Sequence, residues 1–402
     1  MMTQRRVVVA AALMLGSALS ASAQTKDDSR TQYPPVLANS YAALSVGAVD
    51  YLFLPQQLQN GFRASSVDAP HLTVRVALFG HEINRFISVQ GSYMRPVKFV
   101  SYRNVNGAPG NDHHHVRVNF GSVTLKTNAP VAKRESLYAE GGFAITSRTG
   151  FAIDSVPALT DAHFASILLG GGVDLHVNRN WDLTAGMTYS PGKAAVDQQR
   201  TIFSSVGFRY TMRPLTAEQV EANSEGGFIF PRQLIQLEYS SGAGYSVNDF
   251  VSTKVPIFWG GNAKVDMGVA PHYERNVFHT RRLFALDVGT SAGVYMTRQK
   301  DDRFYTASVY PLFRFTFLRS RVVDVYFAYS AAGPTYISKV FLDDLNTGRH
   351  FTFQDFMSLG LFAGRNRHLN LGVKLNHFSN GNIFTQNAGV TIPLTFSAGY
   401  AF

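Results

Sequence analysis

The stretch DFMSLGLFAGRNRHLNLGVKLNHFS, residues 355–379, shows the pattern that identifies the fold class of this chain. Apolar residues alternate with polar or small residues on both sides of a short polar turn, GRNR at residues 364–367. Alternation with period two is the pattern of a β-strand, because successive side chains point to opposite faces. The stretch therefore predicts two antiparallel strands joined by a tight turn, each with one continuous apolar face.

Similar alternating segments recur along the whole chain. The first half has eight, near residues 41–51, 71–79, 86–95, 116–126, 137–146, 165–176, 181–189 and 202–212. The second half has eight more, near residues 233–239, 263–270, 283–295, 307–317, 322–329, 356–363, 369–377 and 390–402. Alternating segments of about ten residues, separated by polar turns, are typical of a transmembrane β-barrel. After residue 23 we find no apolar run of about 18 residues, the length that a membrane-spanning helix needs.

The polar stretch RPLTAEQVEANSEGG, residues 213–227, interrupts this pattern and is interpreted as a linker. We therefore expect an all-β chain with two eight-stranded antiparallel barrels in tandem, within residues 24–212 and 228–402. A single porin-like barrel of about sixteen strands is the alternative. Eight strands leave an interior that side chains fill, whereas about sixteen would enclose an aqueous channel.

Residues 1–23 have the features of a secretory signal peptide. Arg5 and Arg6 precede an apolar run at residues 7–19, and ASA at residues 21–23 fits a cleavage site. With the barrel pattern and a terminal strand that ends in Phe402, this predicts the bacterial outer membrane. The formal net charge of +10 then favours an anionic glycolipid surface over nucleic acid as the partner. The chain has no cysteine, which excludes disulfides and a thiol nucleophile. The oligomeric state stays open.

The strand predicted at residues 369–379 carries two reactive side chains at its end. Its apolar face continues into His377 and Ser379 by the same alternation. In a membrane barrel this face meets lipid, so the two polar residues are expected at the rim of the lipid-facing wall. Pairing across the turn places Ala363 opposite Leu369, and the same register places Asp355 opposite His377. If both chain ends of the barrel are periplasmic, this rim lies in the outer leaflet, where the lipid is lipopolysaccharide.

An acid, a histidine and a serine on one face suggest nucleophilic catalysis. A serine hydroxyl becomes a good nucleophile when a neighbouring base removes its proton, and the base works best when a third group orients it. A side-chain amide such as that of Asn387 can stabilise the oxyanion that follows. The alternative is an ordinary polar strand end that makes hydrogen bonds to headgroups or loops.

These residues resemble the outer-membrane lipid A 3-O-deacylases, also called acyloxyacyl hydrolases. The resemblance covers roughly residues 333–402, and more weakly the second half of the chain. It is carried by GPTYIS at 333–338, HFTFQDF at 350–356 and HFSNGNIFTQNAG at 377–389. It implies that His377 is the general base, Ser379 the nucleophile and Asn387 part of the oxyanion hole. The implied substrate is an ester-linked acyl chain of lipid A, and this chemistry requires no metal or organic cofactor. The first half resembles generic small outer-membrane barrels.

One departure from the family pattern concerns the acid. The family has a glutamate fourteen residues after the histidine, where this chain has Thr391. Strict alternation would put Ile392, Leu394 and Phe396 on the outer face, and Thr391 would then not share that face. The strand register instead nominates Asp355 as the third member, and Asp343 and Asp344 are weaker candidates. The competing function is a non-catalytic barrel with a structural or surface-interaction role.

Overall fold

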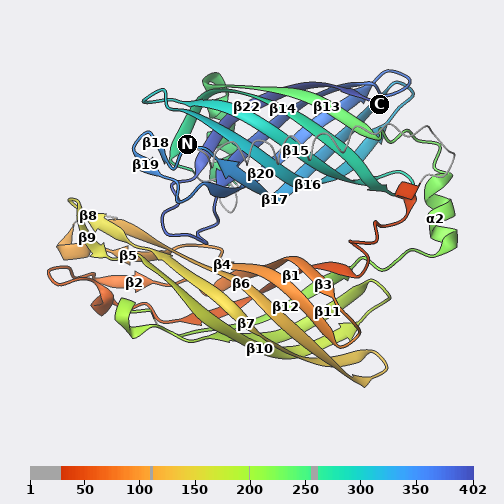
Figure 1. Ribbon diagram of the computed structural model, residues 1–402. Helices are drawn as coiled ribbons and strands as arrows, with labels where there is room; N and C mark the ends of the chain where they lie inside the picture. The colour runs from red at the N-terminus through yellow and green to blue at the C-terminus, as the bar shows by residue number, and fades with distance from the viewer. Residues whose placement is uncertain (1–28, 109–111, 199, 255–260) are drawn as a thin grey trace, which may run out of the picture.

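The computed structural model describes residues 29–108, 112–198, 200–254 and 261–402. These residues form two closed antiparallel barrels of eight strands each, joined by a linker (Figure 1). The prediction of two eight-stranded barrels is therefore confirmed, and the alternative of one larger barrel is wrong. The predicted signal peptide at residues 1–23 lies outside the described residues.

The first barrel closes in the order β6-β4-β3-β1-β12-β11-β10-β7, with β7 pairing back to β6. Every strand corresponds to one of the eight predicted alternating segments, with ends that differ by a few residues. The strands are β1 (Ser40–Tyr51), β3 (Leu72–Glu82), β4 (Ile87–Pro96), β6 (His113–Ala132), β7 (Glu135–Thr149), β10 (Ala162–His176), β11 (Trp181–Ser190) and β12 (Thr201–Thr211).

The second barrel closes in the order β13-β14-β15-β16-β17-β20-β21-β22, with β22 pairing back to β13. All eight strands were predicted, although β14 and β17 extend several residues further. The strands are β13 (Gln233–Ser241), β14 (Ala263–His279), β15 (Phe284–Thr297), β16 (Arg303–Arg319), β17 (Val323–Ile337), β20 (Phe351–Ala363), β21 (Leu369–Ser379) and β22 (Val390–Ala401).

The predicted linker contains a short helix, α2 (Ala217–Ser224). Thr216 caps its first turn by accepting a hydrogen bond from the Gln219 amide at 3.3 Å, which satisfies one donor that the helix leaves open. A second helix, α3 (Tyr245–Lys254), follows β13. In the described part of the chain, no helix is long and apolar enough to cross a membrane.

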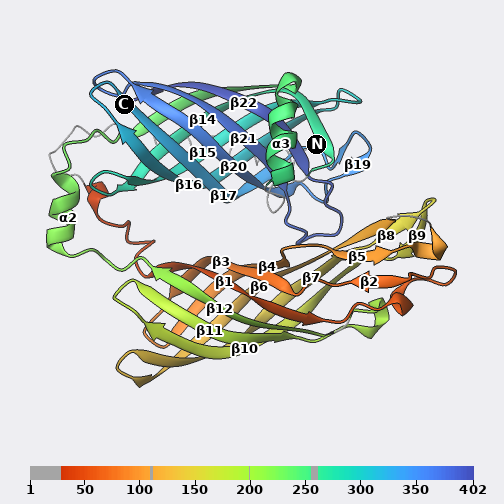
Figure 2. The ribbon, with the colours of Figure 1, turned by 180° about the vertical axis from the view of Figure 1, so that it is seen from behind.

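Short strands decorate the loops and were not predicted, because two to four residues are too few to show alternation. They are β2 (Ser66–Asp68), β5 (Val100–Arg103), β8 (Phe151–Ile153), β9 (Val156–Leu159), β18 (Phe341–Leu342) and β19 (Leu345–Asn346). In both barrels these strands and the longer loops gather at one end, and the linker and short turns lie at the other (Figures 1 and 2). The two ends are called here the loop end and the linker end.

The segment before β1 joins the barrels at the linker end. The Tyr33 ring lies 4.4 Å from that of Phe278 in the second barrel. The Tyr33 hydroxyl is also 2.9 Å from the hydroxyl of Tyr210 in the first barrel. The segment before β1 therefore contacts both barrels and links them in addition to the linker.

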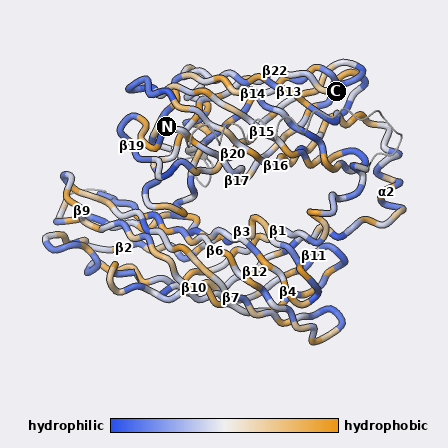
Figure 3. Tube along the Cα trace, in the orientation of Figure 1, coloured by the Kyte–Doolittle hydropathy of each residue, from blue (hydrophilic) through white to orange (hydrophobic). Residues whose placement is uncertain are grey.

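The outer faces of both barrels are apolar, and polar side chains point inward. Along the strands hydrophobic and hydrophilic residues alternate (Figure 3). Outward residues such as Val123, Phe143 and Val206 are 61%, 77% and 66% exposed. A closed barrel leaves no unpaired strand edge, so an apolar outer face suits it to a lipid environment. The chain is accordingly a bacterial outer-membrane protein.

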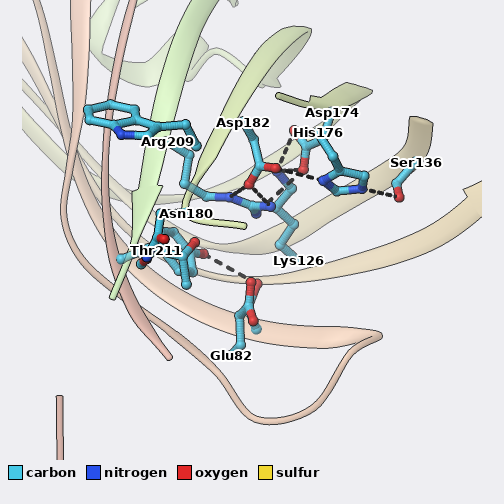
Figure 4. Close-up of polar contacts among 12 residues, drawn as sticks. Glu82, Lys126, Ser136, Asp174, His176, Asn180, Asp182, Arg209 and Thr211 are labelled. Atoms are coloured by element: carbon cyan, nitrogen blue, oxygen red, sulfur yellow. Dashed lines mark hydrogen bonds and ion pairs between the residues drawn. The ribbon is translucent and has the colours of Figure 1, made fainter. Parts of the chain in front are cut away.

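Networks of buried charges fill both interiors. In the first barrel Arg209 donates to Asp182 at 2.7 and 2.9 Å, and Lys126 donates to Asp174 at 2.9 Å (Figure 4). In the second barrel Arg314 lies 2.7 Å from Glu274 and 3.0 Å from Asp287. Such pairs compensate the cost of burying each charge, and they occupy the space that a channel would need.

Removing Arg314 should destabilise the second barrel strongly. Arg314→Leu would leave the carboxylates of Glu274 and Asp287 buried without their shared cation, at a cost of about 3–5 kcal/mol in the free energy of unfolding. Denaturant titration followed by circular dichroism checks this. Arg281→Leu, at an exposed turn, is the matched control and should change stability by less than about 0.5 kcal/mol. Equal stability of both variants would contradict the account of the interior.

Candidate active site

Strands β20 and β21 pair without a register shift over their whole length. Ala363 lies opposite Leu369, Leu361 opposite Leu371, and the ladder continues to Asp355 opposite His377. The pairing predicted from the sequence is therefore confirmed. It places the carboxylate and the imidazole on neighbouring strands and on the same outward face, at the loop end of the barrel.

Strand β22 contains a bulge that changes the position of Thr391. Asn376 pairs with Ile392, whereas Lys374 pairs with Thr395, so β22 has one extra residue in this interval. The bulge includes Pro393, which cannot donate a ladder hydrogen bond. Thr391 consequently lies directly opposite His377, and Ile392 is buried inside the barrel. The expectation that Ile392 shares the outer face with Leu394 and Phe396 was wrong, as was the inward placing of Thr391, because the bulge exchanges the faces of these two residues.

Asp355 is held by a bulge in the next strand. The register between β17 and β20 shifts between Ser330 and Gly333, and Ala332 has a left-handed backbone with φ of 52°. In this conformation the Ala332 amide donates a hydrogen bond to Asp355 Oδ1. The second oxygen, Oδ2, lies 3.9 Å from His377 Nε2. This separation is too long for a direct hydrogen bond, and the two groups form an ion pair only when His377 is protonated.

Ser379 ends β21, two residues after His377 and on the same face. Its Oγ accepts hydrogen bonds from Asn387 Nδ2 at 3.0 Å and from the Gly381 amide at 3.2 Å. Two N–H donors therefore converge on the hydroxyl oxygen. Donors placed beside a nucleophile in this way can also reach an oxyanion that forms on the carbon it attacks.

The loop that carries Asn387 is fixed by side-chain hydrogen bonds. Asn387 Oδ1 accepts from the Asn380 amide at 3.2 Å, which closes the loop onto the end of β21. Asn380 is fully buried and its Nδ2 donates to the carbonyls of Thr347 and Gln386 at 3.1 and 2.9 Å. Left-handed residues at Gly381, Asn382 and Gln386 allow the tight path. The donors are thus positioned before any ligand binds.

The two weaker acid candidates take part in a different contact. Asp343 accepts hydrogen bonds from Thr297 Oγ1 at 2.5 Å and from the Lys300 amide at 2.9 Å, and Asp344 pairs with Lys300. Both therefore serve the turn between β15 and β16. Of the three acids considered, only Asp355 faces His377.

The site lines a cleft of about 850 Å³ whose other wall is the first barrel. His377, Ser379, Asp355, Asn387 and Thr391 all contribute to it. His377 is only 5% exposed although it lies on the outward face. The expectation of a histidine on the lipid-facing wall needs this correction, because His377 is buried beside a cleft that residues of both barrels line.

A second serine, histidine and aspartate set lies inside the first barrel (Figure 4). Ser136 Oγ is 2.9 Å from His176 Nε2, and His176 Nδ1 is 2.6 Å from Asp182. These contacts are shorter than those at Ser379. Ser136 is 4% exposed, however, and among the described residues no N–H donor faces its Oγ apart from the imidazole. We interpret this set as part of the interior charge network.

Sequence reasoning missed the Gly381 amide and the first-barrel wall. A glycine directly after Ser379 and Asn380 was the available signal for a backbone donor with a left-handed conformation. The wall had no local signal, because its residues are separated from Ser379 by more than 200 positions in the chain.

Parts of the chain are similar to known proteins. Residues 260–401 match the family described as "Lipid A 3-O-deacylase (PagL)". No curated protein matches the chain significantly. The solved structure of the outer membrane enzyme PagL is 16% identical, with 42% of this chain and 98% of that chain covered and a TM-score of 0.30. The N-terminal β-barrel domain of Pseudomonas aeruginosa OprF is 14% identical, with 43% of this chain and 98% of that chain covered and a TM-score of 0.27. Neisserial surface protein A is 17% identical, with 43% of this chain and 97% of that chain covered and a TM-score of 0.29. The segment 260–401, which contains every residue of the candidate site, is thus of the lipid A 3-O-deacylase (PagL) family.

Proposed function

We propose that the second barrel is an outer-membrane serine esterase that removes an ester-linked acyl chain from lipid A. The observation that carries this proposal is the convergence of two N–H donors on Ser379 Oγ, beside His377 and Asp355 on one wall. The family of residues 260–401 supports lipid A as the substrate.

The proposed reaction proceeds in two steps. Ser379 Oγ attacks the acyl carbonyl carbon while His377 accepts the hydroxyl proton. The negative charge that forms on the carbonyl oxygen is stabilised by Asn387 Nδ2 and the Gly381 amide. The ester C–O bond then breaks, the sugar oxygen takes the proton from His377, and the acyl group stays on Ser379. Water, activated by His377, hydrolyses this acyl-enzyme and releases a free fatty acid.

Asp355 has the role of orienting and stabilising the histidine. Because Nε2 of His377 faces Asp355, the other ring nitrogen, Nδ1, is the one assigned to Ser379. The Ala332 amide holds Oδ1 of the carboxylate. The other oxygen, Oδ2, is 3.9 Å from Nε2, and a rotation of the side chain that shortens this distance by about 1 Å would give a hydrogen bond. The acid thus comes from β20, whereas the family glutamate would lie on β22 at position 391.

The position of the site suits a lipid substrate. It borders a cleft at the loop end of the barrel, on the outer wall, which is the face that a membrane barrel turns to lipid. Buried ion pairs fill the interior of the second barrel, so a lipid cannot reach the site through the interior. A non-catalytic barrel would have no need to hold two donors against an outward serine hydroxyl.

Replacing the nucleophile should abolish deacylation. Mass spectrometry of lipid A from cells that express the wild type should show loss of one acyl chain, and Ser379→Ala should leave lipid A intact because no other hydroxyl occupies that position. Ser136→Ala is the matched control and should retain full activity. Identical lipid A with and without the wild-type protein would refute the esterase, and loss of activity only in Ser136→Ala would move it to the first barrel.

A carboxylate on either of the two strands that flank His377, β20 or β22, should be able to orient the imidazole. Asp355→Ala should lower kcat by about 10²–10⁴-fold, because the imidazole loses its orienting charge. Adding Thr391→Glu to Asp355→Ala should recover at least about tenfold, since Thr391 lies directly opposite His377. The measurement is the rate of fatty-acid release by purified protein. Full activity of Asp355→Ala would exclude Asp355 from the site.

The Asn387 amide should act as a donor, separately from its role in the loop. Asn387→Ala removes both roles, whereas Asn387→Asp keeps an oxygen that can accept from the Asn380 amide but has no N–H. Both variants should lose about 10²–10³-fold in kcat with little change in KM. Wild-type kcat in Asn387→Asp would show that the amide does not stabilise the oxyanion.

A further inference from the structure

We propose that the outer wall of the first barrel is the second half of the substrate site, and that Arg95 and Arg117 bind a phosphate group of the lipid. This inference rests on the proposed function and extends it, because it assigns a headgroup site to a barrel that lies outside the matched family segment. The ligand class is a phosphorylated glycolipid.

The first barrel touches the loop that carries the oxyanion donors. Ser147 Oγ donates a hydrogen bond to the Asn382 carbonyl at 2.5 Å. A Cβ atom at Gly121 would lie 3.7 Å from Ile383, and one at Gly381 would lie 3.9 Å from the Tyr93 ring. Strands β3, β4, β6 and β7 also line the cleft opposite β20 and β21. The first barrel is therefore a structural neighbour of the reacting groups.

Chemical character changes along this wall in the order that a phosphorylated lipid requires. Counting every second residue of β6 from the loop end gives Arg117, Asn119, Gly121 and Val123, all of which line the cleft. Its neighbour β4 repeats the order with Arg95, Tyr93 and Gly91, and Tyr93 pairs with Gly121. Cations thus lie at the loop end, polar groups next, and small and apolar residues deepest. Arg117 and Gly121 are four residues apart on the strand, a distance of about 13 Å, which is the scale of a lipid headgroup.

The two arginines are held close together by one aromatic ring. The Arg95 and Arg117 guanidinium carbons lie 5.3 and 5.4 Å from the centroid of the Phe99 ring. Stacking on an aromatic ring holds a guanidinium in place, and a guanidinium binds phosphate through paired N–H donors. Two adjacent cations repel each other, and an anion that bridges them removes this repulsion.

Asn119 has an unsatisfied hydrogen-bond donor that indicates a ligand site between the arginines and Ser379. It is 4% exposed and lines the cleft, and its Oδ1 accepts a hydrogen bond from the Tyr93 hydroxyl at 2.7 Å. Its Nδ2 is buried and has no hydrogen-bond partner among the described residues. A buried donor without a partner costs about 1–3 kcal/mol, and a ligand oxygen in the cleft would satisfy it.

The apolar part of the wall is suited to an acyl chain of any kind. Leu78, Phe79, Val123 and Phe143 line the cleft and are half or more exposed. Any lipid-facing barrel wall is apolar, so the specificity of the site has to come from the arginines and Asn119.

A binding experiment tests the phosphate site without requiring turnover. The Ser379→Ala protein in detergent micelles is titrated with lipid A and with the same lipid A after removal of its phosphates. We expect lipid A to bind at least about tenfold more tightly than the dephosphorylated form. Adding Arg95→Gln and Arg117→Gln should abolish this preference. Arg85→Gln with Arg179→Gln removes the same charge at exposed turns of the linker end and should keep it.

The outcomes separate this inference from the proposed function. An unchanged preference for phosphates in the Arg95→Gln, Arg117→Gln protein would overturn the headgroup site, even if wild-type protein deacylates lipid A. A preference lost equally in the Arg85→Gln, Arg179→Gln control would also overturn it, because net charge alone would then explain binding. Absence of deacylation by wild-type protein would instead refute the esterase and leave the binding result standing.

A glycine pair of variants tests the contact between the barrels. Gly121→Ala places a methyl group at ordinary contact distance from Ile383 and should lower the rate of deacylation much less than Gly121→Leu does. Gly121→Leu must displace Ile383 and the loop of Asn387, and should lower the rate at least about tenfold with the protein still folded by circular dichroism. Full activity of Gly121→Leu would show that the first barrel does not bound the site.

Discussion

The unbroken pairing of β20 with β21 is the constraint on which the site depends. Because strand side chains alternate, this single register decides that Asp355 and His377 share a face and that Leu359, Leu361 and their partners share the same face with them. A slip of one residue would turn the imidazole into the barrel, among the buried charges. The chemistry of the site is therefore a consequence of strand register, in a wall whose remaining residues are apolar.

Bulges in the strands that flank β20 and β21 determine which groups lie beside Asp355 and His377. In β17 the bulge directs the Ala332 amide to Asp355, and in β22 the bulge brings Thr391 beside His377. His377 thus has two neighbouring positions where an acid can lie, one on each side. In this chain the residue on the β20 side is Asp355, which we propose as the acid, and the residue on the β22 side is Thr391.

The strands, the two-barrel division and the pairing of Asp355 with His377 were predictable because alternation in β20 and β21 is uninterrupted and the turn between them is short. The position of Thr391 was not predictable, because a bulge adds one residue without a distinct local pattern, and Pro393 is only a weak sign of it. The Gly381 amide was missed because the glycine after Asn380, its only sequence signal, does not show which way a backbone N–H points. The wall of the first barrel was missed because it depends on tertiary packing between segments far apart in the chain.

The central claim is that Ser379 is the nucleophile, and covalent capture tests it most directly. Purified full-length protein in detergent micelles would be treated with a fluorophosphonate, which reacts with activated serines, and the modified peptide would be identified by mass spectrometry. The account predicts phosphonylation of Ser379, with a rate that falls in His377→Ala. Modification of Ser136 instead, or deacylation that persists while Ser379 stays unmodified, would contradict it.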